Sequence, residues 1–205
     1  MDQPFLLMVA GPNGAGKTTL TEFLRRQEID FGEYINPDDI ARDLEGSYDA
    51  RVAEAQVIAD RRREACIAAK RSFSFETVMS HRSKVDILLR AKAAGFLVQM
   101  FFVGTDDPRT NVERVALRVA QGGHDVPEDR IVARWHRVME LLYEATMAPH
   151  TAFVFDNSAS GHAAAGPRLV LLTSTKERGL PQSQVFPPIP AWVQRYILDP
   201  LASMQ

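Results

Sequence analysis

The residues from Gly11 to Thr18 constrain this chain more than any other stretch. They read Gly-Pro-Asn-Gly-Ala-Gly-Lys-Thr and fit the pattern G-x-x-x-x-G-K-[ST], in which a glycine-rich loop holds nucleotide phosphates. The apolar run Leu6–Ala10 precedes the loop, and residues 18–26 favour a helix. A buried strand, a loop and a helix are the setting that this motif requires. The sequence therefore predicts a nucleotide-binding site at this loop.

The residue types in the loop each have a chemical reason. Glycines let backbone N–H groups turn inward around an anion, at the positive end of a helix. Lys17 is expected to reach the β- and γ-phosphates, and the hydroxyl of Thr18 is expected to ligate Mg²⁺. The expected cofactor is thus ATP with Mg²⁺. The expected nucleotide-binding residues are Gly11, Asn13, Gly14, Ala15, Gly16, Lys17, Thr18 and Thr19, together with Asn157 from a later turn.

Composition limits the other classes of function. The chain has 205 residues, 45% of them hydrophobic, which predicts a single domain over residues 1–205 with a proper core. The formal net charge of −2 argues against binding to nucleic acid. No apolar run has the roughly 18 residues of a membrane helix, and the first residues lack the basic start of a signal peptide. The lone Cys66 fits a reducing compartment and is expected to be a core thiol. We therefore expect a cytoplasmic protein that contacts no membrane.

Predicted strands alternate with predicted helices along most of the chain. The strands are expected at Phe5–Ala10, Glu33–Asn36, Ser72–Glu76, Phe96–Val103, Ala152–Phe155 and Arg168–Leu172. The helices are expected at residues 16–27, 40–44, 49–70, 81–94, 108–121 and 127–147. This alternation predicts an α/β fold of the P-loop NTPase type, with a parallel sheet of five or six strands and helices on both faces. Residues 174–205 are rich in proline and are expected to form a strap across the surface, whereas the run Arg61-Arg62-Arg63 is expected to face solvent.

Carboxylates follow two of the predicted strands, at the edge where ligands of such sheets bind. Asp38 is expected to act as the general base that orients an acceptor hydroxyl and takes its proton. Its alternative role is to cap the following helix, which Asp39 could do instead. Glu76 and Thr77 end the third strand and are expected to contact substrate hydroxyls, or in the case of Glu76 to hold Mg²⁺ through water. The alternative is that Glu76 simply reaches solvent at the end of its strand.

Two arginine-bearing helices are predicted to form a lid over residues 106–137. They flank a flexible corner at Gly122-Gly123, and the basic residues recur at helical spacing on each. Arginines in a closed lid would neutralise the charge that develops on a transferred phosphoryl group. The alternative is a pair of solvated faces whose charges are balanced by Glu113, Glu128 and Asp129. The arginines concerned are Arg114 and Arg118 on the first helix and Arg130, Arg134 and Arg137 on the second.

Several of these stretches, taken in order, resemble the zeta-toxin family of P-loop kinases. The resemblance runs from residue 5 to residue 173. The matching stretches are Gly11–Thr19, Asn36-Pro37-Asp38, Phe75-Glu76-Thr77, the corner Gly122-Gly123-His124-Asp125-Val126-Pro127, and Asp156-Asn157-Ser158. It implies ATP-dependent phosphorylation. The plasmid-borne members of the family phosphorylate the 3′-hydroxyl of UDP-N-acetylglucosamine and are neutralised by a small antitoxin protein.

The resemblance also implies a role for individual residues. The implied roles are phosphate and Mg²⁺ binding by Lys17 and Thr18, proton removal by Asp38, substrate contact by Glu76, and the first lid arginine at Arg118 or its neighbour Arg114. One departure concerns the second lid arginine, which the toxins carry just before the proline that opens the next helix. Here His124-Asp125-Val126 stands at that place, so Arg130 or Arg134, one or two turns further on, is the expected substitute.

Three functions stay open on the sequence. The leading one is a kinase of the zeta-toxin type that acts on a hydroxyl of a nucleotide sugar. The second is a kinase for another acceptor, such as a nucleotide, a sugar or an RNA end, although the net charge argues against long nucleic acid. The third is a binding module without catalysis, in which ATP closes the lid and a partner protein reads the closed state.

Overall fold

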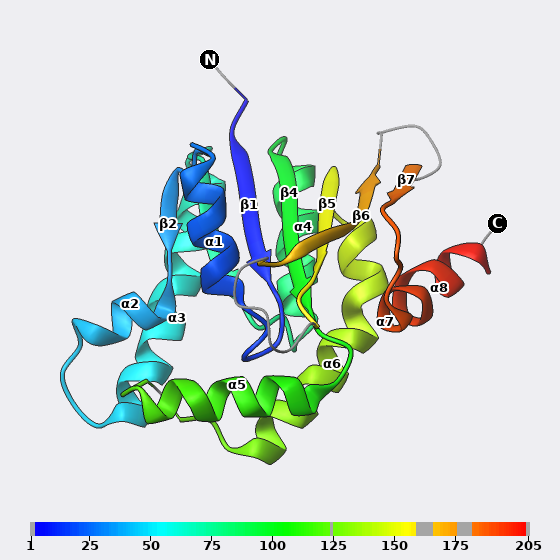
Figure 1. The fold of residues 1–205 in the computed structure, drawn as a ribbon. Coiled ribbons are helices and arrows are strands. Elements are labelled where there is room, and N and C mark those ends of the chain that lie inside the picture. Colours follow the sequence, from blue (N-terminus) through cyan, green and yellow to red (C-terminus); the bar gives the residue numbers. More distant parts are fainter. Residues whose placement is uncertain (1–2, 124, 159–165, 176–181, 204–205) are drawn as a thin grey trace.

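A seven-stranded sheet forms the centre of the protein in the computed structural model, which describes residues 3–123, 125–158, 166–175 and 182–203. The strands are β1 (Phe5–Ala10), β2 (Glu33–Ile35), β3 (Phe73–Thr77), β4 (Leu97–Gly104), β5 (Thr151–Asp156), β6 (Arg168–Ser174) and β7 (Gln182–Val185). Their order across the sheet is β2-β3-β1-β4-β5-β6-β7 (Figure 1). Neighbours from β2 to β5 run parallel, whereas β6 and β7 are antiparallel. The predicted α/β fold of the P-loop NTPase type is confirmed.

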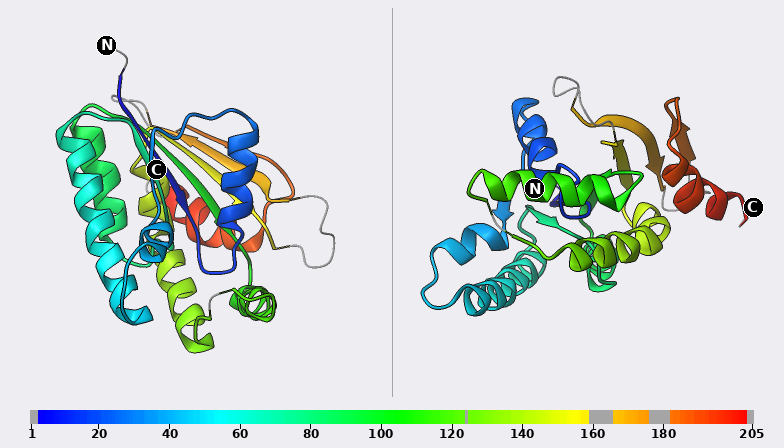
Figure 2. Two further views of the ribbon diagram at one scale, coloured as in Figure 1. Left: turned by 90° about the vertical axis from the view of Figure 1, so that its left-hand side faces the viewer. Right: turned by 60° about the horizontal axis from the view of Figure 1, so that its bottom comes forward.

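Helices connect the parallel strands and cover both faces of the sheet (Figure 2). They are α1 (Lys17–Arg26), α2 (Pro37–Arg42), α3 (Tyr48–Ala68), α4 (Ser83–Ala93), α5 (Pro108–Ala120) and α6 (Glu128–Met147). The chain ends in three short helical segments, α7 (Ala191–Val193), η1 (Gln194–Leu198) and α8 (Asp199–Ala202). All six helices predicted up to residue 147 are present, with bounds that differ by a few residues.

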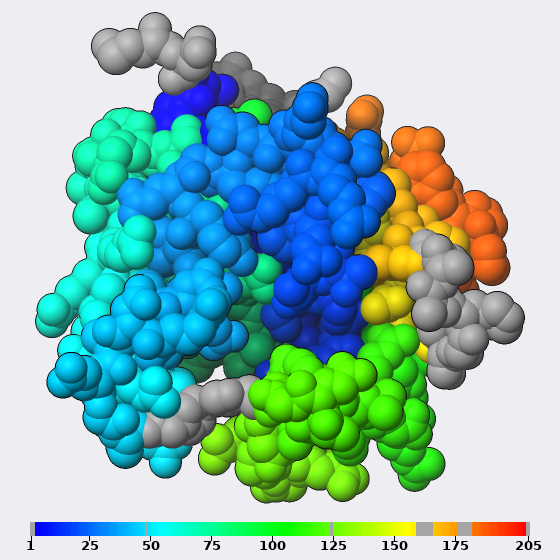
Figure 3. All heavy atoms as spheres, turned by 60° about the vertical axis from the view of Figure 1, so that its left-hand side comes forward, coloured from blue at the N-terminus to red at the C-terminus, as the bar shows by residue number. Residues whose placement is uncertain are grey.

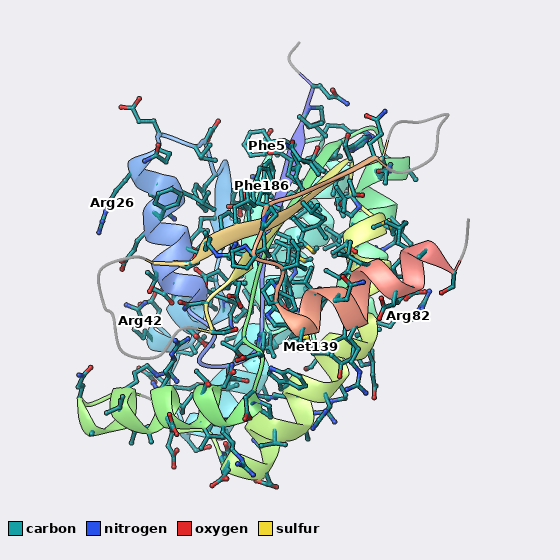
Figure 4. All side chains as sticks on the ribbon, turned by 45° about the vertical axis from the view of Figure 1, so that its right-hand side comes forward. Phe5, Arg26, Arg42, Arg82, Met139 and Phe186 are labelled. Atoms are coloured by element: carbon teal, nitrogen blue, oxygen red, sulfur yellow. The ribbon has the colours of Figure 1, made fainter. Side chains whose placement is uncertain are left out.

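Alternating side chains of the strands divide the core into two clusters. On β1, Leu6 and Met8 belong to the larger cluster, which α3, α4, α6 and the C-terminal helical segments cover. Leu7 and Val9 face the opposite way, into a smaller cluster that α1 covers. Phe5, labelled in Figure 4, packs against this smaller cluster. β1 lies between β3 and β4, so the loop that follows it leaves from an interior strand of the sheet.

Local capping explains where several helices begin. The side chain of Asn36 accepts a hydrogen bond from the backbone N–H of Asp38, and Pro37 occupies the first turn of α2. Asp107 caps α5 in the same way, with Pro108 at the start of the helix. Proline suits this position because the missing N–H would have no partner within the helix. These caps fix the two helices that start next to the phosphate-binding loop.

The last strands and one arginine differ from the sequence-based expectations. The sheet has seven strands rather than five or six, because residues 182–185 add an exposed edge strand that lacks a hydrophobic pattern. Arg63 was expected to face solvent, but only 2% of its surface is exposed. Its guanidinium lies 4.8 Å from the centre of the Phe75 ring and pairs with Asp60. The aromatic ring and the carboxylate together compensate the buried charge, and the arginine run by itself identifies neither partner.

Candidate active site

The loop from Gly11 to Gly16 joins β1 to α1 at the carboxyl edge of the sheet. A Cβ on Gly11 would lie 2.1 Å from the backbone oxygen of Val103, and one on Gly14 would lie 2.5 Å from that of Asn111. Gly14 also has a φ of +74°, which side chains disfavour. Neighbouring strands and helices therefore press on the loop so closely that only glycine fits. Backbone N–H groups at the start of α1 follow immediately, as anion binding requires.

Lys17 lies at the centre of the charged groups of this site. Its Nζ donates hydrogen bonds to the carbonyl oxygens of Gly11 at 2.8 Å and Pro12 at 3.0 Å. Burial lowers the pKa of Lys17 from 10.5 to about 8. Four charged side chains from other elements act on it as well: Glu76 and Asp38 raise its pKa, whereas Arg118 and Arg134 lower it. The structure thus gathers five of the predicted site residues into one electrostatic cluster.

Glu76 ends β3 directly beside the strand that carries the loop, opposite Val9. Its Oε1 accepts hydrogen bonds from the hydroxyl of Thr21 at 2.6 Å and from that of Tyr34 at 2.8 Å. The carboxylate is half-buried and oriented by two neighbours, so it does not simply reach solvent. Neither donor was singled out from the sequence, because they lie 55 and 42 residues away from Glu76 and carry no motif.

Thr77 hydrogen-bonds both the turn that follows β3 and the phosphate-binding loop. Its hydroxyl accepts a hydrogen bond from the backbone N–H of Met79 at 3.1 Å, and its carbonyl accepts one from the N–H of Gly11 at 3.3 Å. Met79 is fully buried with a positive φ of 61°. Thr77 therefore stabilises a strained turn and one end of the phosphate-binding loop.

Asp38 does not cap α2. The cap is Asn36, and Asp39 pairs with Arg42 one turn further along the helix. The carboxylate of Asp38 is exposed. It lies close enough to Lys17 to raise the pKa of that lysine. The capping alternative for Asp38 is therefore wrong, and its side chain is available to a ligand. Figure 3 shows the surface hollowed between α2, the start of α1 and α5.

The predicted lid helices α5 and α6 pack against each other, and α5 crosses below the carboxyl edge of the sheet in Figure 1. Arg134 on α6 is half-buried, and its Nη1 donates to Oδ1 of Asn13 in the loop at 3.3 Å. On α5, Arg118 is exposed and Arg114 half-buried. Arg130 and Arg137 are exposed on α6. The corner between the helices contains His124, which lies outside the described residues.

Two asparagines donate hydrogen bonds to backbone oxygens of the phosphate-binding loop. Asn111 is fully buried on α5; its amide donates to the backbone oxygen of Asn13, and its Oδ1 accepts from Thr105. Trp135 on α6 donates to the backbone oxygen of Thr105 at 3.2 Å. Asn157, which follows β5, donates to the backbone oxygen of Ala15 at 2.8 Å. Asn157, expected to bind the nucleotide, thus lies against the loop and hydrogen-bonds its backbone, whereas the supporting role of Asn111 was missed.

Among the residues that the structure describes, no group of three or more His, Cys, Asp or Glu side chains is arranged to hold a metal ion. Within the same ranges, no helix is long and apolar enough to cross a membrane.

The buried thiol of Cys66 donates to Glu33, and burial raises the pKa of Cys66 to about 11, so this cysteine is a poor nucleophile.

A loop and sheet of this kind can be compared with known proteins. The family AAA_33, described as an AAA domain, matches residues 6–142, more than half of the chain. This chain belongs to the AAA_33 family. The matched residues include the phosphate-binding loop, Asp38, Glu76 and both lid arginines that act on Lys17. The match ends inside α6, so β5 and Asn157 lie beyond it.

Relatives of this AAA_33 chain include proteins known by sequence and by structure. An uncharacterized protein of Haemophilus influenzae is 28% identical over 135 residues, which cover 63% of this chain and 91% of the relative. A chain of the AvrRxo1-ORF1:AvrRxo1-ORF2 complex with sulphate ions has a TM-score of 0.64 at 18% identity, covering 83% of this chain and 58% of that one. A chain of the PezAT chromosomal toxin–antitoxin system of Streptococcus pneumoniae has a TM-score of 0.56 at 13% identity, covering 77% of this chain and 69% of that one. At these identities the two structures share the fold with this chain. This chain spans little more than half of the AvrRxo1 chain.

Proposed function

We propose that this protein is an ATP-dependent kinase that transfers the γ-phosphoryl group to a hydroxyl of a small-molecule acceptor. The observation that carries the proposal is the electrostatic cluster around Lys17. Two carboxylates and two arginines from four different elements act on this one lysine, beside a glycine-rich loop at a helix N-terminus. Phosphoryl transfer needs this combination, because catalysis rests on positioning and on neutralising the charge of the transferred group.

The donor side of the proposed site is the loop with the start of α1. Backbone N–H groups would bind the phosphates, and Lys17 would leave its two carbonyl partners to reach the β- and γ-phosphates. The exposed hydroxyl of Thr18 is an oxygen donor of the kind that Mg²⁺ prefers, and we propose that it holds the ion, while Glu76 contacts hydroxyls of the acceptor. When bound, Mg²⁺ would help to neutralise the phosphate charge.

The acceptor side lies at Asp38. In the proposed reaction the acceptor hydroxyl gives its proton to the carboxylate of Asp38, its oxygen forms a bond to the γ-phosphorus, and the bond from that phosphorus to the leaving oxygen of ADP breaks. Asp38 suits this role because its carboxylate is exposed and takes no part in capping α2. Arg118 on α5 and Arg134 on α6, with Arg114 on α5 as a further candidate, would neutralise the developing charge from the lid.

The acceptor that we propose first is a nucleotide sugar such as UDP-N-acetylglucosamine. The resemblance of the ordered motifs to the zeta-toxin family supports this choice, and so does the fold shared with a chain of a toxin–antitoxin system. On the same grounds we propose that a small antitoxin protein binds the chain. The use of ATP would place the reaction in the cytoplasm. Because the second lid arginine is displaced to Arg134, a different hydroxyl acceptor is the first alternative.

The experiment that tests the proposed function incubates the protein with MgATP and a mixture of sugar nucleotides, sugars and nucleosides, followed by mass spectrometry and ³¹P NMR. We expect one new phosphorylated species, formed together with ADP. Asp38→Asn should lower the turnover by about 100-fold or more, as expected for loss of a general base. Asp39→Asn, one residue along the same helix, is the matched control and should stay within a fewfold of the wild type.

Two results would contradict the proposal. Phosphotransfer at the wild-type rate by Lys17→Ala or Asp38→Asn would exclude the mechanism. Binding of ATP without consumption against the whole panel of acceptors would favour the nucleotide-switched binding module instead.

A further inference from the structure

Two hydroxyl groups from separate elements converge on the carboxylate of Glu76 in the proposed site. The hydroxyl of Tyr34 on β2 donates to Oε1 of Glu76 at 2.8 Å, and Oε1 also accepts from the hydroxyl of Thr21 on α1 at 2.6 Å. Glu76 itself lies at the end of β3, beside the strand that leads into the phosphate-binding loop. Three elements, β2, β3 and α1, thus meet at one carboxylate.

The two carboxylate oxygens of Glu76 differ in the number of hydrogen bonds that they accept. Both hydroxyl donors end on Oε1, and within the described part of the chain no hydrogen bond is made to Oε2. A carboxylate that accepts two hydrogen bonds on one oxygen is held in a fixed rotamer as an acceptor. The second oxygen is then left for a ligand of the site. Glu76 therefore offers one oriented acceptor atom beside Lys17.

Tyr34 is well suited to act as a fixed donor. Its hydroxyl is half-buried, and burial together with the Glu76 carboxylate raises the pKa of Tyr34 above its ordinary value. The ring is also fixed from outside, since the guanidinium of Arg25 lies 4.7 Å from its centre and the Phe31 ring meets it edge-on at 5.9 Å. The phenol is thus held by its ring and donates its proton in one direction only.

We propose that Tyr34 is a positioning residue for the transfer reaction, and that with Thr21 it sets the carboxylate of Glu76 on the acceptor side. The hydroxyls of Tyr34 and Thr21 orient Glu76 directly. Tyr34 acts through Glu76 and does not itself contact the reacting atoms. The inference rests on the proposed function, and it adds that Glu76 is held by two hydroxyl groups from two other elements.

Loss of the Tyr34 hydroxyl should therefore affect the two substrates, MgATP and the acceptor, differently. The nucleotide phosphates are held by the loop, by Lys17 and by the start of α1, none of which depends on Tyr34 for its position. Removing the phenol hydroxyl should therefore leave the binding of MgATP unchanged. It should weaken the acceptor side, because a misplacement of about 1 Å of the groups that position a substrate can cost up to about 100-fold in rate.

The test compares kcat and the KM values of both substrates for Tyr34→Phe, Thr21→Val and Thr21→Ser. Tyr34→Phe and Thr21→Val should each lower kcat/KM for the acceptor by about 10-fold or more, with the dissociation constant for MgATP within about twofold of the wild type. Thr21→Ser keeps the hydroxyl and should restore most of the activity. Tyr196→Phe, on η1 beside Trp135, is the matched control for loss of a phenol hydroxyl and should behave like the wild type.

The outcomes separate this inference from the proposed function. If the wild type transfers phosphate and Tyr34→Phe does so with unchanged kcat and acceptor KM, the positioning role is wrong and the kinase assignment stands. If the wild type transfers phosphate to no acceptor, the proposed function fails and the positioning role fails with it.

A measurement without any acceptor checks the contact between Tyr34 and Glu76 itself. In ¹³C NMR of ring-labelled tyrosine, Glu76→Gln should move the titration of Tyr34 to lower pH, since the carboxylate contributes to raising its pKa. An unchanged titration would overturn the contact on which the inference depends.

Discussion

The guanidinium of Arg134 donates from Nη1 to Oδ1 of Asn13 at 3.3 Å, a contact between residues 121 positions apart in the sequence. The backbone of the same Asn13 accepts a hydrogen bond from the side chain of Asn111. Both lid helices thus reach the phosphate-binding loop at one residue, α6 through its arginine and α5 through its asparagine. The lid is therefore tied to the loop at the place where phosphates are expected to bind.

Arg134 is predicted to be the more important arginine of α6. In the proposed reaction it exchanges its contact with Asn13 for one with the phosphoryl group. Arg134→Ala should then lower kcat by about 100- to 1,000-fold, as expected when a donor to developing charge is removed. Arg137→Ala, on an exposed position one turn along the same helix, should have little effect. Steady-state kinetics of the two variants decide the matter, and equal losses would show that α6 contributes only general positive charge.

Asn111 is predicted to hold the loop in its binding shape. Asn111→Ala leaves the buried hydroxyl of Thr105 and the backbone oxygen of Asn13 without this partner. Loss of a buried polar partner costs about 1–3 kcal/mol, so the free energy of unfolding should fall by that amount. The affinity for ATP should fall with it. Glu113→Ala, on an exposed position of the same helix, serves as the control for urea unfolding and calorimetric titration. If Asn111→Ala lowers the free energy of unfolding but leaves the affinity for ATP unchanged, Asn111 contributes to folding and does not hold the loop in its binding shape.

Gly14 and Gly122 offer a matched pair that separates backbone strain from close contact. Both have positive φ angles, +74° and +86°, but a Cβ on Gly122 meets no atom within 4 Å. Gly122→Ala should therefore cost only the strain of the backbone, about 1 kcal/mol. Gly14→Ala adds a Cβ 2.5 Å from the backbone oxygen of Asn111 and should lose more stability together with ATP binding. Thermal unfolding with and without ATP distinguishes the two, and equal effects would contradict the close contact.

Lys17 is predicted to lower the stability of the nucleotide-free protein while making nucleotide binding possible. Its folded-state pKa of about 8 lies below the ordinary 10.5, a difference that corresponds to at most roughly 3 kcal/mol. Lys17→Met should therefore raise the free energy of unfolding at pH 7 by about 1–2 kcal/mol, because the buried charge is removed. The same variant should bind no ATP.

The pH dependence of this effect has a definite sign. Between pH 8 and 10.5 the unfolded chain retains the proton of Lys17 while the folded chain has released it, so this group makes the wild type more stable as pH rises. The stability advantage of Lys17→Met should thus shrink between pH 7 and pH 10. Urea unfolding at both pH values measures it, and an advantage that grows with pH would contradict the lowered pKa.

Many local features of the site could be predicted because their signals lie close together in the sequence. The phosphate-binding loop has eight spaced positions between an apolar strand and a helix, and both flanks are present as predicted. The position of Asp38 followed from the predicted strand and from Pro37, which both precede it. The capping role, in contrast, went to Asn36, since asparagine and aspartate are nearly equal as caps and only the fold decides between neighbours.

Features that depend on distant residues could not be predicted in the same way. The contact of Arg63 with Phe75, the buried Asn111 below the loop and the edge strand β7 all join segments without a shared motif. Each is decided by which side chains the packed core brings into contact. Periodicity reports which face of an element is buried, and it does not report which residue of another element lies opposite.

The sequence by itself determined that this chain holds a phosphate-binding loop in an α/β sheet, because glycine spacing and strand patterning act over a few residues. The tertiary structure alone decided how the site is built around that loop. It brought Glu76, Asp38, Arg118 and Arg134 into electrostatic reach of Lys17, and it oriented Glu76 through the hydroxyls of Tyr34 and Thr21. The physical reason is that hydrogen bonds and charge interactions act over a few ångströms in space, and only packing of the parallel sheet brings these separate segments so close.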